Sequence, residues 1–415
     1  MTDGLACAAA LVVLGGTLAV AVTRPPYVSE AVAACVGGVL LVIVGAIGLS
    51  GAGDALKALG PTVGFLAAML LIADGCRREG LFDAMGAVMA RGSRGSPQRL
   101  LTFVFVVAAA ITAMLSLDAT IVLLTPVVFA TAARMRTSAK PHVYACAHLA
   151  NSASLLLPVS NLTNLLAFHA SKLSFLHFGA LMALPTVAAV GVEWMVFRRF
   201  FAVDLERPRR AGAQTARPAL PRFAVSVLAF TLVGFALSSL VAIEPVWFAA
   251  AGAVAMSAPA LARRTTSPLA LVRAAEPGFL VFVLGLGVIV QAASVNGLDS
   301  AVRAVVPTGA SLGSLLAIAA VSAILANLVN NLPATLMLVP VTATAGVGPA
   351  LATLIGVNVG PNLTYVGSLA TLLWRRVLRT EDADVELGEF LRLGALTVPA
   401  ALLAATGLLW LVLKV

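Results

Sequence analysis

The chain is built largely from uncharged apolar runs, each close to or above the length of ~18–20 residues that a helix needs to cross a bilayer. Only 11% of its 415 residues are charged and 60% are hydrophobic, which is too little charge to cover a soluble domain. Together with the segments between them, the runs predict about ten to twelve transmembrane segments in one membrane domain. The clearest runs are Gly4–Thr23, Ala31–Gly53, Leu100–Leu117, Phe223–Ile243, Pro245–Ala262, Pro277–Leu298 and Leu393–Leu413.

The net charge of +9 comes mainly from short basic clusters that lie between the apolar runs. Such clusters are typical of cytoplasmic loops under the positive-inside rule, so we expect a multi-pass protein of the bacterial plasma membrane. The clusters lack interleaved aromatic residues and a soluble fold, which argues against a nucleic-acid-binding surface. The clusters are Arg77/Arg78, Arg91/Arg94/Arg99, Arg134/Arg136/Lys140 and Arg375/Arg376/Arg379.

Motifs for enzymatic chemistry are missing from the sequence. It has no GxxxxGK[ST] nucleotide-binding motif and no arrangement of nucleophile and base, so we expect no catalytic residues and no cofactor. The cysteines Cys7, Cys35, Cys76 and Cys146 lie far apart without a CxxC pair, which argues against a disulfide framework and a zinc site. Transport by this chain alone must therefore use an ion gradient, unless a separate ATPase subunit docks.

Two pairs of segments indicate an internal duplication. Residues 151–166 align without gaps on residues 358–373, and Ser116–Pro126 aligns on Asn330–Pro340 in the same order. Inverted repeats are the common arrangement in transporters with broken helices, so we expect an all-α polytopic protein with two inverted repeats. The predicted boundaries are a first repeat at 1–197, a cytoplasmic linker loop at 198–222 and a second repeat at 223–415.

The asparagines are concentrated in two apolar zones. Of nine asparagines, eight lie within residues 141–171 or 304–374, and only Asn296 lies elsewhere. An unsatisfied amide in hydrocarbon costs on the order of a few kcal/mol. Asparagine beside glycine and proline favours helices that break and turn their free backbone groups toward a solute, whereas the alternative is hydrogen bonding between helices. The predicted solute-binding asparagines are Asn151, Asn161, Asn330, Asn331, Asn358 and Asn362.

Asp118 is a carboxylate within an apolar stretch, between Leu100–Leu117 and Ala119–Ala133. A carboxylate at membrane depth can carry a proton through a transport cycle, which makes Asp118 a candidate for proton coupling. The alternative is a capping residue for the helix that follows, and a hairpin tip can use both. His148 precedes Asn151 by about one helical turn, where packing is the simpler interpretation and a proton relay the other.

These motifs resemble the signatures of arsenical pump membrane proteins. In the first half the resemblance is carried by Leu123-Leu-Thr-Pro-Val-Val128 after Asp118, and by Leu157-Pro-Val-Ser-Asn-Leu-Thr-Asn-Leu165. In the second half it is carried by Asn330–Ala334 and by Gly356–Trp374, which is the most specific segment. The resemblance covers nearly the whole chain and fits the wider ion transporter superfamily, which includes dicarboxylate and sodium–proton carriers.

The resemblance implies a scaffold domain and a transport domain in which two re-entrant hairpins face two unwound helices. It adds Ser160 and Ser368 to the expected solute site, and it implies efflux of arsenite or antimonite coupled to inward protons. A separate ATPase subunit and a homodimer are further partners that it suggests. The alternative within the superfamily is a carrier of carboxylates or inorganic anions, or a sodium–proton antiporter. Leu117 departs from the family, which tends to place asparagine there.

Overall fold

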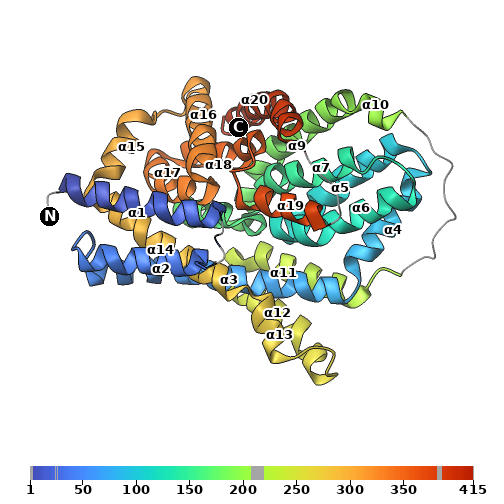
Figure 1. Ribbon diagram of the computed structural model, residues 1–415, viewed down its shortest axis with the longest axis horizontal. Helices are drawn as coiled ribbons and strands as arrows, with labels where there is room; N and C mark the ends of the chain where they lie inside the picture. Colours follow the sequence, from blue (N-terminus) through green and yellow to red (C-terminus); the bar gives the residue numbers. More distant parts are fainter. Residues whose placement is uncertain (1–2, 24, 26, 207–218, 381–385, 415) are drawn as a thin grey trace.

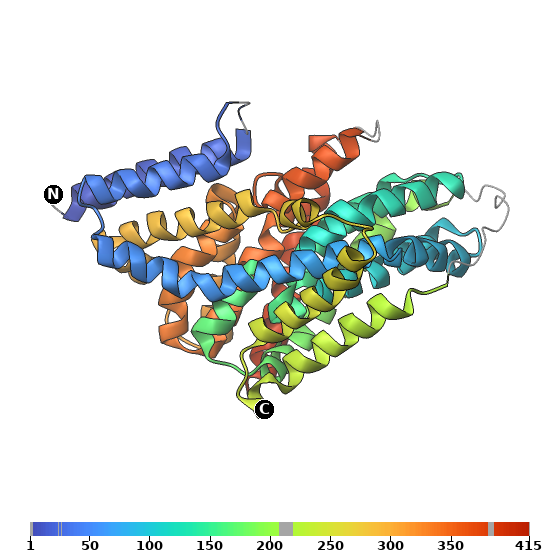
Figure 2. The same cartoon turned by 90° about the horizontal axis from the view of Figure 1, so that it is seen from below.

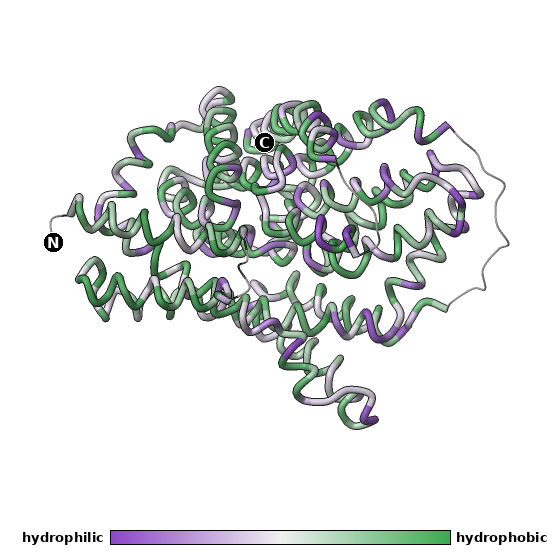
Figure 3. The backbone as a smooth tube through the Cα atoms, in the orientation of Figure 1, coloured by the Kyte–Doolittle hydropathy of each residue, from purple (hydrophilic) through white to green (hydrophobic). Residues whose placement is uncertain are grey.

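The computed structural model describes residues 3–23, 25, 27–206, 219–380 and 386–414, and this part of the chain contains helices and no strand (Figure 1). Within it, nine helices are long and apolar enough to cross a membrane, and shorter apolar helices accompany them. Figure 3 shows a backbone that is mostly hydrophobic, with hydrophilic stretches gathered toward the end that carries α4, α7 and α10. The prediction of an all-α polytopic membrane protein is confirmed. The middle of the predicted linker 198–222 lies outside the described residues.

A first layer is formed by helices from the start of each half of the chain. Helix α14 packs on α1, α2 and α3, and α12 packs on α3 and α11. Figure 2 shows α3 crossing most of the length of the molecule. A Cβ atom added at Gly285 would lie 2.8 Å from the Cβ of Ala34, so α14 and α2 touch through small residues. The members are α1 (Asp3–Thr23), α2 (Glu30–Ile43), α3 (Leu49–Arg78), α11 (Arg222–Val241), α12 (Pro245–Ala262), α13 (Pro268–Ala274) and α14 (Pro277–Ala293).

The remaining helices form a second layer, in which α9 packs on α20 and α16 packs on α18. Its first-half members are α4 (Leu81–Ser93), α5 (Pro97–Met114), η1 (Ala119–Leu124), α6 (Thr125–Arg134), α7 (Lys140–Ser152), η2 (Ala153–Leu156), η3 (Pro158–Ser160), α8 (Leu162–Ser171), α9 (Phe175–Phe200) and α10 (Ala202–Leu205). Its second-half members are α15 (Asp299–Val305), α16 (Leu312–Val329), α17 (Asn331–Ala345), α18 (Val347–Val359), η5 (Gly360–Leu363), α19 (Leu369–Thr380) and α20 (Leu387–Val412), and η4 (Ser294–Leu298) connects α14 to α15 beside α1.

Each half contains one helical hairpin. In the first, α5 reverses at residues 115–118 and returns through η1 and α6, and the hydroxyls of Thr112 and Thr120 meet across it at 2.7 Å. In the second, α16 reverses at Asn330 and returns as α17. Asn330 has a φ of 76° and a ψ of 156°, a backbone conformation that residues other than glycine rarely adopt. The predicted re-entrant hairpins are therefore present.

Each half also contains one broken helix. Helix α7 ends at Ser152, and extended backbone at Leu157 and Asn161 separates it from α8. Leu157 precedes Pro158, and a residue before proline is driven out of the helical region by steric clash. In the second half, α18 passes into η5, which contains Pro361, and Thr364 is extended before α19 begins. The predicted broken helices are present as well.

Basic residues distinguish the two membrane faces. Helices α3 and α9 carry Arg78 and Arg199 in their last turns, and the first hairpin ends at Arg134. The second hairpin begins after Ser311 and ends before Gly346, and the basic residue at that end is Arg303 of α15, which donates to the hydroxyl of Thr344 at 3.3 Å. The positive-inside rule therefore leads us to expect the end with Arg78, Arg134 and Arg199 on the cytoplasmic side. Figure 1 places α5 and α6 at the right and α16 and α17 at the left, as inverted repeats require.

Close backbone contacts hold the second broken helix in place. A Cβ atom added at Gly394 of α20 would lie 2.4 Å from the carbonyl oxygen of Asn362. A Cβ atom added at Gly356 of α18 would lie 2.3 Å from the carbonyl oxygen of Ala319 in α16. Any larger residue at these two positions would push the unwound segment away from its neighbours, so glycine is needed for the close approach.

Candidate functional site

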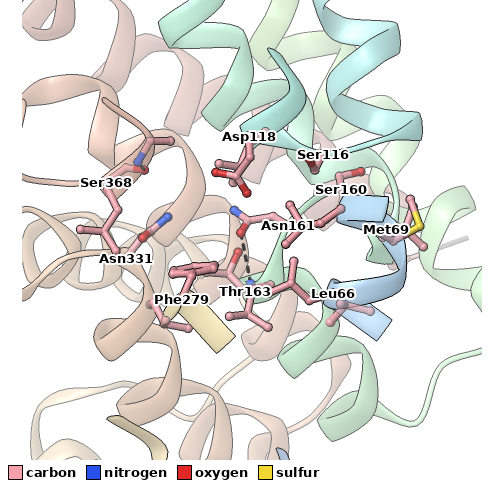
Figure 4. Close-up of a pocket in the computed structure, with 18 of the residues that line it drawn as sticks. Leu66, Met69, Ser116, Asp118, Ser160, Asn161, Thr163, Phe279, Asn331 and Ser368 are labelled. Carbon is pink, nitrogen blue, oxygen red and sulfur yellow. Dashed lines mark hydrogen bonds between the residues drawn. The ribbon is translucent and has the colours of Figure 1, made fainter. Parts of the chain in front are cut away.

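A cavity of about 50 Å³ lies where four helical segments of the described chain begin (Figure 4). These segments are η1 of the first hairpin, α8 of the first broken helix, α17 of the second hairpin and α19 of the second broken helix. A helix N-terminus carries N–H groups without intrahelical partners and the positive end of the helix dipole. Four positive ends therefore face one space. The polar residues that line it are Ser116, Asp118, Ser160, Asn161, Thr163, Asn331 and Ser368.

The tip of the first hairpin directs a carboxylate into the cavity. Asp118 stands at the N-cap position of η1, yet its side chain makes no capping hydrogen bond in the described structure. The hydroxyl of Ser116 takes that role instead, because it accepts a hydrogen bond from the N–H of Ala119 at 3.1 Å. Figure 4 shows the Asp118 carboxylate pointing toward Asn161. The structure therefore does not support a capping role for Asp118. Its carboxylate faces the cavity, where it is available for the other role considered, proton binding.

The first broken helix contributes Ser160, Asn161 and Thr163. Asn161 caps α8, since its side-chain oxygen accepts a hydrogen bond from the N–H of Thr163 at 3.3 Å. The hydroxyl of Ser160 donates to the carbonyl oxygen of Ala113 at 2.8 Å. That bond joins the unwound segment to α5, so the first hairpin and the first broken helix are positioned together.

The second hairpin is joined to the second broken helix in the same way. The N–H of Asn331 donates to the carbonyl oxygen of Gly367 at 3.0 Å, and the side-chain amide of Asn330 donates to the carbonyl oxygen of Val366 at 3.1 Å. The hydroxyl of Ser368 accepts a hydrogen bond from the N–H of Ala370 at 3.1 Å. Backbone bonds thus fix the tip, and Figure 4 shows the Asn331 side chain directed toward the cavity.

The remaining wall of the cavity is apolar and comes from the first layer. Phe65, Leu66 and Met69 of α3 and Phe279 of α14 line it. The polar ends of the second layer therefore face hydrophobic side chains of the first. Exclusion of water by such a wall strengthens the electrostatic effect of the four helix N-termini on anything that enters.

Asn358 lies behind the cavity wall, where it holds α8 in place. Its side-chain oxygen accepts hydrogen bonds from the amide of Asn161 at 3.0 Å and the hydroxyl of Thr163 at 2.8 Å. Its amide donates to the side-chain oxygen of Asn164 at 2.6 Å. Asn358 therefore acts as a positioning residue that joins the second broken helix to the N-terminus of α8.

Asn151 and Asn362 also point away from the cavity. The amide of Asn151 donates to the side-chain oxygen of Asn362 at 2.8 Å, and the amide of Asn362 donates to the carboxylate of Glu193 at 3.0 Å. Both asparagines and Glu193 are fully buried. The sequence signal for Glu193 was available, because it is a carboxylate within the apolar run of α9, as Asp118 is within its own run.

The predicted solute-binding residues thus separate into three groups. The structure brings Ser160, Asn161, Asn331 and Ser368 together around the cavity, beside Asp118, the residue predicted for proton coupling. Asn330 lies at the turn just behind the tip, and Asn151, Asn358 and Asn362 form the buried network behind it. Ser116 and Thr163 line the cavity and were not predicted, although both flank predicted residues in the sequence.

Thiol and metal ligands do not gather at the cavity. Among the described residues that line it, none is a cysteine. Cys76 and Cys146 are buried elsewhere, whereas Cys7 and Cys35 lie on first-layer helices. The described residues contain no group of three or more histidine, cysteine or acidic side chains that could hold a metal ion. A solute in this cavity would therefore meet amides, hydroxyls, one carboxylate and helix N-termini.

Two wider cavities in the described chain are formed partly by helices that also line the small one. The first, about 420 Å³, is lined by Glu30, Glu276 and Phe279, and Phe279 also lines the central cavity. The second, about 460 Å³, is lined by His169, Gln291 and other residues of α3, α8, α14 and α17, the same helices that enclose the central cavity. The second cavity therefore shares helices, but no lining residue, with the small polar cavity.

Comparisons with known proteins agree with this architecture. The sequence profile of the family described as "Citrate transporter" matches residues 17–361. An arsenical pump membrane protein of Escherichia coli is 28% identical over 340 residues, covering 77% of this chain and 79% of that protein. An uncharacterized transporter of Mycobacterium tuberculosis is 25% identical over 369 residues, covering 83% and 84%. The crystal structure of the YdaH transporter of Alcanivorax borkumensis superposes with a TM-score of 0.58 at 16% identity, covering 88% of this chain and 87% of that chain, and supports the fold.

Proposed function

The chain belongs to the citrate transporter family of membrane transporters, and we propose that it exports arsenite or antimonite across the plasma membrane in exchange for protons. The observation that carries this proposal is the small cavity at which four helix N-termini and the Asp118 carboxylate meet. Such a site offers hydrogen-bond donors and an acceptor in one enclosed space. It suits a small solute with several hydroxyl groups.

Size favours an inorganic solute. A cavity of about 50 Å³ has room for roughly three to five water-sized groups. Trivalent arsenic and antimony form neutral trihydroxides of about this size, whereas citrate is several times larger. The similarity to arsenical pump membrane proteins over 77% of the chain supports the same solute class.

Hydrogen bonding favours a neutral trihydroxide as well. Each hydroxyl can donate to the Asp118 carboxylate and accept from the amides of Asn161 and Asn331 or from a helix N-terminus. The same carboxylate can instead bind a proton. Solute and proton would then compete for Asp118, which is the simplest way for a carrier to exchange one for the other.

An anion carrier is the alternative that the geometry also supports. Four helix N-termini attract negative charge, as they do in other transporters with broken helices. Against an anion stands Asp118, whose own negative charge faces the same small cavity. A sodium-driven anion carrier would depend on sodium, and a sodium–proton antiporter would move no arsenite.

The division of the chain follows from the same proposal. Each of the segments 1–197 and 223–415 supplies one hairpin and one broken helix to the cavity. We assign them as the two repeats, joined by the cytoplasmic linker 198–222. Replacement of residues in that linker therefore changes no residue that lines the cavity.

The proposal predicts arsenite uptake into energised everted vesicles, with loss of uptake on adding a protonophore. A variant with alanine at Cys7, Cys35, Cys76 and Cys146 should retain that uptake, because no thiol lines the cavity among the described residues. Vesicles from cells without the protein serve as the control. If the vesicles take up citrate, or take up an anion only when sodium is present, and take up no arsenite, the protein is an anion carrier instead.

A further inference from the structure

Glu193 is a fully buried carboxylate on α9 that the transport site does not use. One of its oxygens, Oε1, accepts hydrogen bonds from the hydroxyl of Ser152 at 2.6 Å and the amide of Asn362 at 3.0 Å. The other oxygen, Oε2, has no hydrogen-bond partner among the described residues. A carboxylate so placed within the membrane needs a compensating positive charge or a proton.

Among the described residues, His148 is the basic side chain that lies within 4.0 Å of this carboxylate. It is fully buried, and its Nδ1 atom lies 3.7 Å from Oε1 of Glu193. Neither of its ring nitrogens has a hydrogen-bond partner among the residues that the structure describes. Its ring centroid lies 5.0 Å from that of Phe197 and 5.6 Å from that of Phe390, so the imidazole is enclosed by apolar side chains.

Other titratable residues on the surrounding helices do not neutralise the pair. In the described structure none of them hydrogen-bonds to Glu193 or His148. Glu389 of α20 is instead paired with Lys140 at 3.0 Å. His142 is occupied by backbone carbonyls of Ser138 and Pro97. The other titratable residues on the elements that pack against α7 and α9 are Arg99, Asp118, Arg134, Tyr144, Cys146, His177, Arg198, Arg199, Asp204, Arg222, Arg375, Arg376, Arg379 and Arg392.

The pair also contacts both broken helices. Ser152 ends α7 of the first broken helix, and Asn362 belongs to η5 of the second. Both donate to Glu193, so the carboxylate joins the two unwound segments that lead to the solute cavity. A change in the protonation of Glu193 changes the strength of both hydrogen bonds, because bonds to a charged acceptor are stronger than bonds to a neutral one.

We infer that Glu193 and His148 form a second proton-binding site behind the solute cavity, in which Glu193 holds a proton and His148 is neutral. An ion pair in the membrane interior would need a charge-assisted hydrogen bond, and the 3.7 Å between Nδ1 and Oε1 is too long for one, so the geometry favours the neutral pair. In the transport cycle this proton enters from the side opposite the cytoplasm and leaves to the cytoplasm, and no other bond is made or broken. The transport part of this inference depends on the proposed function, whereas the proton-binding part does not.

Infrared spectroscopy of the purified protein in lipid tests proton binding without any solute. The C=O stretching band of a buried protonated carboxyl is expected at neutral pH, with loss of the Glu193 component in Glu193→Gln and no loss in the control Glu389→Gln. An unchanged band in Glu193→Gln would overturn the inference. If that variant does not fold, His148→Gln should shift the pH at which the band disappears, and an unshifted band would overturn it equally.

Transport assays test the coupling role. Glu193→Gln keeps an oxygen that can accept from Ser152 and Asn362, so exchange of arsenite for arsenite across the membrane should remain near the wild-type rate. Accumulation driven by a proton gradient should fall several-fold. Full accumulation in the variant, or equal loss of exchange and accumulation in folded protein, would contradict a coupling role. Absence of arsenite transport in the wild type would reject the proposed function and leave the infrared result standing.

Discussion

Vesicles that contain Asp118→Asn should lose protonophore-sensitive arsenite uptake. The asparagine keeps the size of the side chain but carries no negative charge and cannot exchange a proton. A hydrogen bond to a charged group contributes about 1.5–3 kcal/mol, which corresponds to about a 10- to 100-fold weaker interaction with the solute. The proton gradient should in addition stop driving whatever uptake is left, because the group for which solute and proton compete is gone.

Asp74→Asn is the matched control for this prediction. Asp74 lies near the end of α3, where it is paired with Arg77 and Arg78, as expected for an interfacial residue. The control variant should take up arsenite as the wild type does. Gradient-driven uptake in Asp118→Asn at the wild-type level would remove Asp118 from the coupling step while keeping arsenite as the solute.

Asn358→Leu should have the largest effect on stability. The substitution keeps a similar volume but removes the partner of Asn161, Thr163 and Asn164, which would be left unsatisfied inside the protein. Each unsatisfied buried group costs ~1–3 kcal/mol, so a loss of at least about 3 kcal/mol in the free energy of unfolding is expected. Thermal unfolding in detergent, followed by loss of helical circular dichroism, measures this change.

Thr406→Val provides the contrast. The Thr406 hydroxyl is buried on α20 and has no hydrogen-bond partner among the described residues. Its removal should leave the unfolding temperature unchanged or slightly higher, since no bond is lost and a buried polar group disappears. Equal unfolding temperatures for Asn358→Leu and the wild type would contradict the positioning role of Asn358.

Much of the fold could be predicted because the membrane restricts the choices. Uncharged runs of helical length can only be helices in lipid, and Pro158 and Pro361 mark where two of them break. Asp118 was conspicuous for the same reason, as a charge in an apolar run. The placement of the two hairpins at opposite ends of the molecule needed the structure, which shows that Arg134 and Gly346 end corresponding elements.

The direction of each asparagine side chain could not be predicted. Asn161 and Asn358 both lie beside helix breaks, yet only Asn161 lines the cavity, whereas Asn358 faces α8. That difference depends on the rotation of α18 against the other half of the chain, which a sequence repeat does not encode. Glu193 stands out in the sequence as Asp118 does, but its pairing with Asn362 and His148, which lie 169 and 45 residues away along the chain, is visible only in the structure.

A structure of the protein with bound antimonite, with antimony located by its anomalous scattering, tests the central claim most directly. The account predicts one antimony peak in the small cavity, with its hydroxyls within hydrogen-bonding reach of Asp118, Asn161 and Asn331 and away from every cysteine. A peak bound to a cysteine thiol, or an empty cavity at a concentration that saturates transport, would contradict it.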